Sequence, residues 1–220
     1  MRRVGLAVVA AFLFASSACD GSRVTMSPIP PPRSWEQELT AHRRARDAVF
    51  ASDPDSPLPV AQRSAFRGLA YFPPDPAWRY AGSVTRYPTA ERITIVTTNG
   101  KPRPCERLGR VTFARDGRVL ALQVYRLLDL PDRPGGEGLF LPFKDETTGK
   151  ETYPAGRYVD LDGPDGGPFV LDFNKAYNPS CAYGEPERFQ CPVTPAENAL
   201  PIAVTAGERG PAHVAEERTR

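Results

Sequence analysis

Short β-branched segments separated by tight-turn dipeptides dominate the chain after residue 78. Residues 92–98 end at Asn99-Gly100, and the segments 109–115 and 118–127 flank Asp116-Gly117. Asn-Gly and Asp-Gly favour two-residue hairpin turns, because both central positions adopt positive φ angles. Further strands are expected at 139–143, 156–162, 168–173 and 200–206. About eight short strands at this spacing predict a mainly β fold, an antiparallel meander closed as a barrel or a sandwich.

One α-helix is expected before these strands. Ser34-Trp35-Glu36-Gln37 has the capping-box pattern, with Ser34 as N-cap and Gln37 three positions later. The helix is expected to stop at Ser52-Asp53-Pro54. The apolar residues that fall near one helical face are Trp35, Leu39, Ala45 and Val49. The arginines interpreted as its solvated face are Arg43, Arg44 and Arg46.

The first eighteen residues have the form of a secretory signal peptide. Arg2 and Arg3 precede an uncharged, mostly apolar stretch at 4–15, which is followed by Ser16-Ser17-Ala18-Cys19. Twelve helical residues span about 18 Å, less than a hydrocarbon core of roughly 30 Å. Residues 1–18 are therefore interpreted as a signal peptide rather than a membrane span.

Cys19 follows a small residue at the end of this apolar stretch, as in bacterial lipoprotein signals. In that interpretation Cys19 carries a diacylglycerol and an amide-linked chain such as palmitate, which together anchor the protein stably in the cell envelope, on the periplasmic or extracellular face. Ser16-x-Ala18 also suits an ordinary signal peptidase, which would leave a secreted protein.

The remaining chain is expected to form one domain. Residues 19–33 contain Ser27-Pro28-Ile29-Pro30-Pro31-Pro32 and are interpreted as the lipid-attachment site and a Pro-rich spacer. A single β-rich domain would follow at 34–208, with a frayed tail at 209–220.

The overall charge gives no support for partners that require a strongly basic protein. Lys and Arg number 28 and Asp and Glu 26, so removal of Arg2 and Arg3 with the signal peptide leaves 26 of each sign. A neutral mature chain gives no bulk-charge argument for binding nucleic acid or an acidic membrane. The expected partners are the membrane, through the lipid on Cys19, and a small-molecule ligand, and the sequence names no protein partner.

Few side chains are available for a metal or for known catalytic motifs. The chain has two histidines, His42 and His213, and has no nucleophile elbow, phosphate loop or dinucleotide fingerprint. Asp160-x-Asp162-Gly163-x-Asp165 is interpreted as a hairpin turn, because Pro164 and the missing Glu at position twelve break the calcium-loop pattern. We therefore predict no metal and no cofactor.

Cys181 and Cys191 lie in a loop that contains Pro and Gly. In an exported protein their first interpretation is a local disulfide, because a metal site would need more ligands and no histidine lies near in sequence. If Cys19 is lipidated, Cys105 is left over and is expected to be a buried thiol.

Specific polar residues are concentrated between positions 139 and 208. They run in the order Asp172-Phe173-Asn174, Asn178-Pro179-x-Cys181, Cys191-Pro192 and Ala206-Gly207-Glu208. In this order the chain resembles the domain-of-unknown-function family 1684, over 139–208 and more loosely back to Trp35. The resemblance implies that family members without an export signal carry the same cysteine pair, which leaves paired free thiols or metal ligands as alternatives to the disulfide. It implies no established activity, so the function has to be argued from the residues.

Asp172 and Asn174 are two apart and are expected on one face of a strand, with Arg157 and Tyr158 on the preceding strand as their partners. One interpretation is a buried polar network that fixes loop 177–191 against the sheet. The other is a pocket floor with Asp172 as acid, base or ligand anchor. The candidate pocket residues are Asp145, Tyr153, Arg157, Tyr158, Asp172, Asn174, Asn178, Tyr183 and Asn198.

Two functional classes follow from these alternatives. A non-catalytic, surface-anchored module for small-ligand binding or assembly is favoured by the missing catalytic motifs and the neutral charge. The alternative is an enzyme that acts on a small molecule through Asp172, Asn174, Arg157 and Tyr183. Full hydrogen bonding of Asp172 would favour the first, and a raised pKa in a concave site the second. A flavin-binding barrel is a further idea that rests on architecture alone.

Overall fold

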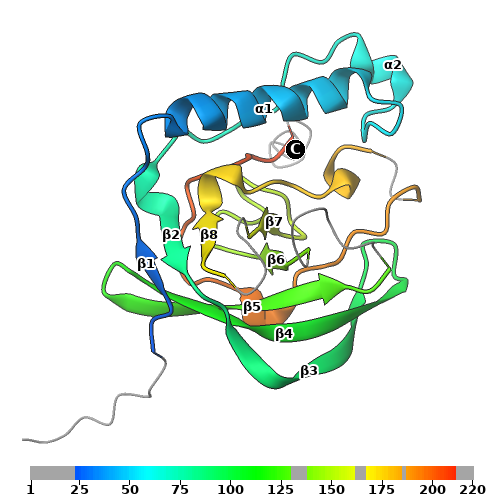
Figure 1. The fold of residues 1–220 in the computed structure, drawn as a ribbon. Helices are drawn as coiled ribbons and strands as arrows, with labels where there is room; N and C mark the ends of the chain where they lie inside the picture. The colour runs from blue at the N-terminus through cyan, green and yellow to red at the C-terminus, as the bar shows by residue number, and fades with distance from the viewer. Residues whose placement is uncertain (1–22, 130–137, 162–166, 185–186, 212–220) are drawn as a thin grey trace, which may run out of the picture.

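The computed structural model describes residues 23–129, 138–161, 167–184 and 187–211 (Figure 1). The expected signal peptide, Cys19, most of the Asp160–Gly166 turn and residues 212–220 lie outside the described residues. The helices are α1 (Trp35–Ser52) and α2 (Val60–Arg63). The strands are β1 (Met26–Pro28), β2 (Arg79–Gly82), β3 (Thr85–Val96), β4 (Pro102–Arg115), β5 (Arg118–Leu127), β6 (Phe140–Phe143), β7 (Arg157–Asp160) and β8 (Phe169–Asp172). Short 3-10 turns are η1 (Pro76–Trp78), η2 (Phe173–Lys175), η3 (Ser180–Ala182) and η4 (Ala196–Asn198).

The strands form one nearly closed, barrel-shaped sheet in the order β7-β6-β5-β4-β1-β2-β8, with β3 paired to β4. Neighbours β4 to β7 are antiparallel and follow one another in the chain, as a meander requires. Tyr158 on β7 and Tyr177 after β8 exchange two backbone hydrogen bonds of 2.9 Å, which brings the two ends of the sheet together. The predicted fold class, mainly β with an N-terminal helix, is confirmed.

The Asp116-Gly117 hairpin is also confirmed. Asp116 has φ 51° and Gly117 φ 74°, so both central residues occupy the left-handed region that this turn requires.

β1 occupies part of the segment that we expected to be a spacer. Met26 is fully buried and pairs with Gly82 of β2 and, in parallel, with Phe113 of β4. A Cβ on Gly82 would lie 1.9 Å from the Thr25 carbonyl oxygen, so this close approach requires glycine. The spacer interpretation is wrong for these three residues, because a strand this short joins a sheet through its backbone and leaves no periodic apolar pattern.

α1 lies across one end of the barrel (Figure 1) and has the predicted extent, but it faces the barrel differently. Ser34 adopts a helical conformation and its hydroxyl donates to the Glu38 carboxylate, so the predicted capping box does not form. Val49 is 46% exposed and Ala45 is exposed, whereas Trp35, Leu39 and Phe50 are buried. Arg43 and Arg46, expected in solvent, lie on the covered side, and only Arg44 of the three is exposed.

One further expectation differs from the structure. Residues 200–206 are irregular rather than a strand, and their backbone groups bond partly to the backbone of Lys144 and Glu146 and partly to the side chains of Arg157 and Asp145.

Two apolar cores stabilise the fold. The larger fills the barrel with residues such as Phe113, Leu122 and Phe173, and the smaller joins Cys105, Tyr125 and Tyr158. No helix in the described part of the chain is long and apolar enough to cross a membrane.

Candidate functional site

The predicted site residues are distributed over separate buried networks rather than one pocket. The first network pairs Arg157 of β7 with Asp145, both with side chains 1% exposed or less. The Arg157 guanidinium donates to the Asp145 carboxylate at 2.9 Å and to the carbonyls of Val204, Ala206 and Glu208. Burial lowers the pKa of Arg157, and the Asp145 charge opposes that shift.

Asp145 is fully engaged in this network. Its carboxylate accepts from Arg157, from the Val204 amide, from both the amide and hydroxyl of Thr147, and from the Thr148 hydroxyl. Arg157 Nε has no partner. The pair therefore fixes the irregular C-terminal segment against β7.

The second network is centred on Asp172, at the end of β8. One carboxylate oxygen accepts from Trp35 Nε1 and Arg79 Nε, both at 3.0 Å, and the other accepts from the Asn174 amide and side chain at 3.0 and 2.9 Å. Asn174 also exchanges two 2.8 Å bonds with the Asp75 backbone. Asp172 thus ties α1 and β2 to β8.

The expected pairing of Asp172 and Asn174 with Arg157 and Tyr158 is wrong. Asn174 lies in η2 rather than in the strand, and the cation facing Asp172 is Arg79, on the neighbouring β2. The chain bends after Asp172, so the side-chain alternation on which we based the expectation ends there.

The third network surrounds Glu208, which is fully buried between α1 and the segment after β8. We call Arg43, Arg46, Tyr71, Asn178, Tyr183 and Glu208 the Glu208 cluster. Arg46 Nε donates to the carboxylate at 2.5 Å, and the Tyr183 hydroxyl donates to it at 2.9 Å. The Asn178 amide donates to it at 2.8 Å. Gly207, with φ 80° and the Ala176 carbonyl 2.6 Å from an added Cβ, allows this buried turn.

Several polar atoms of the Glu208 cluster have no hydrogen-bond partner. They are the Tyr71 hydroxyl, Asn178 Oδ1 and Arg43 Nε. The Arg43 guanidinium lies 4.4 Å from the centre of the Tyr71 ring. Buried polar groups are normally satisfied, so unpartnered atoms call for water or a ligand at this place.

Burial and the charge of Glu208 together shift the pKa values of Tyr183 and Arg46. Burial and then the Glu208 charge raise the pKa of Tyr183 well above its usual value, so this hydroxyl is protonated at neutral pH. Burial lowers the pKa of Arg46, but Glu208 more than offsets this and the net shift is upward. The cluster is thus a fixed ion pair with neutral phenols around it.

The three remaining candidates, Asn198, Tyr158 and Tyr153, lie outside these three networks. The Asn198 side chain exchanges two hydrogen bonds with the Gln123 backbone and donates to the Pro142 carbonyl. The Tyr158 hydroxyl donates to the Pro192 carbonyl beside the disulfide. Tyr153 is half-buried, and burial raises its pKa.

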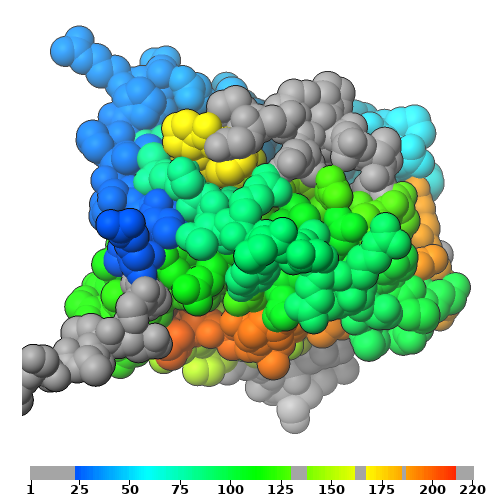
Figure 2. Space-filling model, turned by 60° about the horizontal axis from the view of Figure 1, so that its bottom comes forward, coloured from blue at the N-terminus to red at the C-terminus, as the bar shows by residue number. Residues whose placement is uncertain are grey.

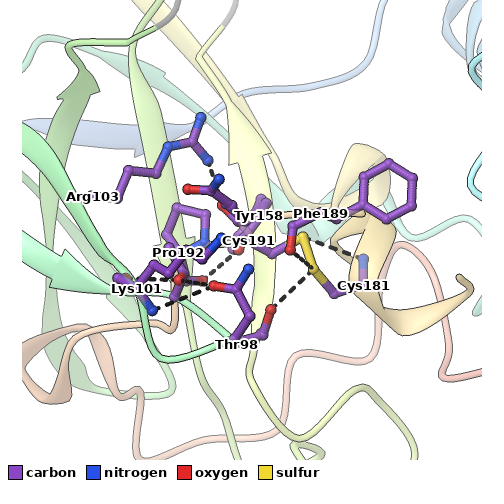
Figure 3. Close-up of a disulfide and its surroundings, with 11 residues drawn as sticks. Thr98, Lys101, Arg103, Tyr158, Cys181, Phe189, Cys191 and Pro192 are labelled. Atoms are coloured by element: carbon purple, nitrogen blue, oxygen red, sulfur yellow. Dashed lines mark hydrogen bonds between the residues drawn. A yellow bond between two sulfur atoms is a disulfide. The ribbon is translucent and has the colours of Figure 1, made fainter. Parts of the chain in front are cut away.

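Cys181 and Cys191 form the expected disulfide, with a Cα–Cα distance of 6.2 Å (Figure 3). The Thr98 hydroxyl donates to Cys181 Sγ, and the Thr98 amide donates to the Cys191 carbonyl. Cys105 is a buried free thiol, as predicted, and burial raises its pKa to about 11. Among the described residues, no group of three or more His, Cys, Asp or Glu side chains is placed to hold a metal.

Sequence reasoning missed the partners that complete these networks: Trp35, Arg43, Arg46, Tyr71, Arg79 and Glu208. Glu208 was within the Ala-Gly-Glu order that we singled out, and Trp35 was expected on the apolar face of the helix, but neither pattern named a partner. We assigned the arginines of α1 to the solvated face because a run of charged residues on a helix usually faces solvent.

Comparison with known proteins gives the family and no activity. Residues 64–209 match the family described as protein of unknown function DUF1684. No curated protein matches. An uncharacterised protein of Haloarcula marismortui, solved in solution by NMR, is 39% identical with a TM-score of 0.60, over 80% of this chain and 94% of the other. The chain therefore belongs to the DUF1684 family.

Proposed function

We propose that the protein is an exported, lipid-anchored module of the bacterial cell envelope that binds a small ligand or serves assembly, and is not a catalyst. The observation that carries this proposal is the state of Asp172. A carboxylate has about four acceptor sites, and Asp172 receives four hydrogen bonds from Trp35, Arg79 and Asn174. The carboxylate is thus held by protein donors on both oxygens, which argues against a role in accepting a substrate proton.

The enzyme alternative needs Asp172, Asn174, Arg157 and Tyr183 around one pocket. Arg157 instead pairs with Asp145, and Tyr183 with Glu208. This separation supports the binding module over the enzyme.

Within the proposal, the small ligand binds at the Glu208 cluster. Its support is the unpartnered Tyr71 hydroxyl and Asn178 Oδ1, a donor and an acceptor in one cluster. A polar molecule that offers one acceptor and one donor would satisfy both.

Anchoring is tested by phase partition of the full chain from native membranes. We expect the wild type in the detergent phase and the Cys19→Ser variant in the aqueous phase. A wild-type protein found wholly in the aqueous phase would refute the anchor.

Ligand binding is tested by native mass spectrometry of the protein purified from those membranes. A bound small molecule should be present in the wild type and lost from Tyr71→Phe. Tyr87→Phe is the matched control, because the Tyr87 hydroxyl donates to Gln123 on the far side of the barrel and should not affect binding. Equal retention in all three proteins would place the ligand elsewhere.

A further inference from the structure

The N-terminal segment meets the folded domain on β4. The Thr112 hydroxyl donates to the Arg23 carbonyl at 2.6 Å, and the Thr25 amide donates to the Thr112 carbonyl at 3.0 Å. The buried Met26 follows directly. The chain is therefore attached to the sheet from residue 23 onward, ten residues earlier than the expected spacer would end.

This attachment shortens the tether to the membrane. Only residues 20–22 separate Cys19 from Arg23. Fully extended chain spans at most about 3.6 Å per residue, so the two Cα atoms lie within about 14 Å of each other. That distance is less than two Debye lengths of about 8 Å at physiological ionic strength. A lipid on Cys19 would hold this part of the sheet within electrostatic reach of the headgroups.

The strands around the attachment point are strongly basic. We call residues Thr85–Leu127, which form β3, β4 and β5, the β3–β5 ribbon. The ribbon carries nine Lys and Arg residues and three Asp and Glu residues. Because residues 19–220 carry 26 of each sign, the rest of the mature chain has an equal excess of negative charge. Overall neutrality thus conceals a strong charge asymmetry.

Basic residues also lie at the entry point itself. Arg110 is two positions from Thr112 and is the register partner of Thr85, which Arg86 follows. Arg23 and Arg86 are exposed, and Arg110 is partly exposed. The three are called the entry arginines below.

The ribbon and α1 lie at opposite ends of the molecule (Figure 1). From the ribbon side, the ribbon extends over the face beside the point where the N-terminal chain enters (Figure 2). A chain anchored at Cys19 would therefore present the ribbon to the membrane and α1, with the Glu208 cluster beneath it, away from the membrane.

We propose that the β3–β5 ribbon docks on the anionic phospholipid headgroups of the membrane that holds the lipid anchor, with the entry arginines making the first contacts. Guanidinium groups suit this role because they bind phosphate oxygens in bidentate geometry. This inference rests on the lipid anchor of the proposed function and adds an orientation to it.

The orientation is tested with the full lipidated chain in vesicles that carry a headgroup-attached quencher. A fluorophore is placed at Val119→Cys on β5 or at Val49→Cys on α1, positions 51% and 46% exposed. In vesicles of phosphatidylcholine with phosphatidylglycerol, we expect strong quenching at position 119 and little at position 49. Equal quenching at both positions would overturn the docking while leaving the anchor intact.

The contact is tested without the anchor, using the full Cys19→Ser chain and the same vesicles. Binding should weaken with salt and vanish on phosphatidylcholine alone. Arg23→Gln and Arg110→Gln should each weaken it roughly fivefold, with unchanged melting temperature. The control is Arg44→Gln with Arg67→Gln, exposed arginines of α1 and the following loop, which should leave binding unchanged.

The second test separates the two proposals. Salt-sensitive binding of the Cys19→Ser chain supports the ribbon contact even if the wild type proves not to be lipidated. Equal losses from the entry and control variants, or tighter binding to heparin than to the anionic vesicles, would overturn it.

Discussion

The Asp145–Arg157 pair and the Glu208 cluster are two buried ion-pair sites that share the C-terminal segment but differ in how completely they are satisfied. Arg157 donates four hydrogen bonds and Asp145 accepts five, and only Arg157 Nε is left over. In the Glu208 cluster the carboxylate is satisfied, but Tyr71, Asn178 and Arg43 each keep an unpartnered atom.

This difference indicates that the Asp145–Arg157 pair is structural, whereas the Glu208 cluster is a candidate binding site. A buried network with a single unpartnered atom mainly rigidifies a fold, whereas several unpartnered atoms on different residues cost free energy that a ligand or water can recover. Substitutions in the first site should therefore act on stability alone. Substitutions in the second should divide into those that lower stability and those that do not.

The largest effect is expected from Arg157→Met, which leaves Asp145 buried without its counterion. Breaking a buried ion pair in this way costs about 3–5 kcal/mol, and the melting temperature should fall by about 6–20 °C. The control is Arg209→Met, whose ion pair with Glu151 is half-exposed and should contribute less than about 1 kcal/mol. Equal melting temperatures for the two variants would show that the Asp145 network is not structural.

Asp172→Asn should be the next most damaging change. Each carboxylate oxygen accepts from two donors, so either orientation of the new amide places its NH2 group against two N–H groups. We expect a loss of about 3 kcal/mol, because Arg79 keeps its bond to the Pro30 carbonyl. Thermal unfolding should record a fall of about 6–12 °C. A shift under about 2 °C would instead mark Asp172 as a functional group.

Local signals in the sequence were enough for much of the fold. Asp116-Gly117 fixed a hairpin, Ser52-Asp53-Pro54 ended α1, and the spacing of Cys181 and Cys191 indicated their bridge. Each depends on residues close together in the chain, where turn geometry and loop length act directly.

The composition of the networks could not be predicted because their members are far apart in sequence. Asp172 lies 137 residues from Trp35 and 93 from Arg79, and Glu208 lies 162 from Arg46. A helical run of arginines does not show which of them face a carboxylate on another element. For the same reason, we identified the motif residues but not the pairs they form.

Removing the disulfide should destabilise the Glu208 cluster more than the Asp145–Arg157 pair. Cys181 belongs to the segment that carries Asn178 and Tyr183 to Glu208. Cys181→Ala with Cys191→Ala should cost about 2.5–3 kcal/mol in the chain-entropy model. Hydrogen exchange should show lost protection at 177–183 before any change at Arg157, and uniform loss would contradict this local role.

Peptide mapping of the wild type supplies the matching redox measurement. Cys181 should be recovered linked to Cys191 without reductant, and Cys105 should be alkylated only after denaturation. Burial raises the pKa of Cys105 to about 11, so it remains a protonated thiol at neutral pH. Rapid alkylation of Cys105 in the native protein would contradict its place in the smaller core.

Tyr183→Phe removes a hydroxyl that donates to Glu208 and accepts from Asn178. A hydrogen bond to a charged group contributes about 2 kcal/mol, and urea denaturation should record this loss. Because burial and Glu208 raise the pKa of Tyr183, its contribution is complete below about pH 10, the usual tyrosine pKa. It is lost as the pH rises through the folded-state pKa, so the wild type and the variant should converge only in strong alkali.

The smallest effect on stability is expected from Tyr71→Phe in the same cluster. This hydroxyl is buried without a hydrogen-bond partner, so its removal eliminates an unsatisfied donor rather than a bond. The free energy of unfolding should stay unchanged or rise slightly, in contrast to the loss in Tyr183→Phe. If the two variants lose equal stability, Tyr71 is satisfied in the folded protein and the comparison between a saturated and an unsaturated site fails. If Tyr71→Phe keeps its stability and loses the co-purifying molecule, the hydroxyl is retained for binding at a cost to the fold, as stability–activity trade-offs predict.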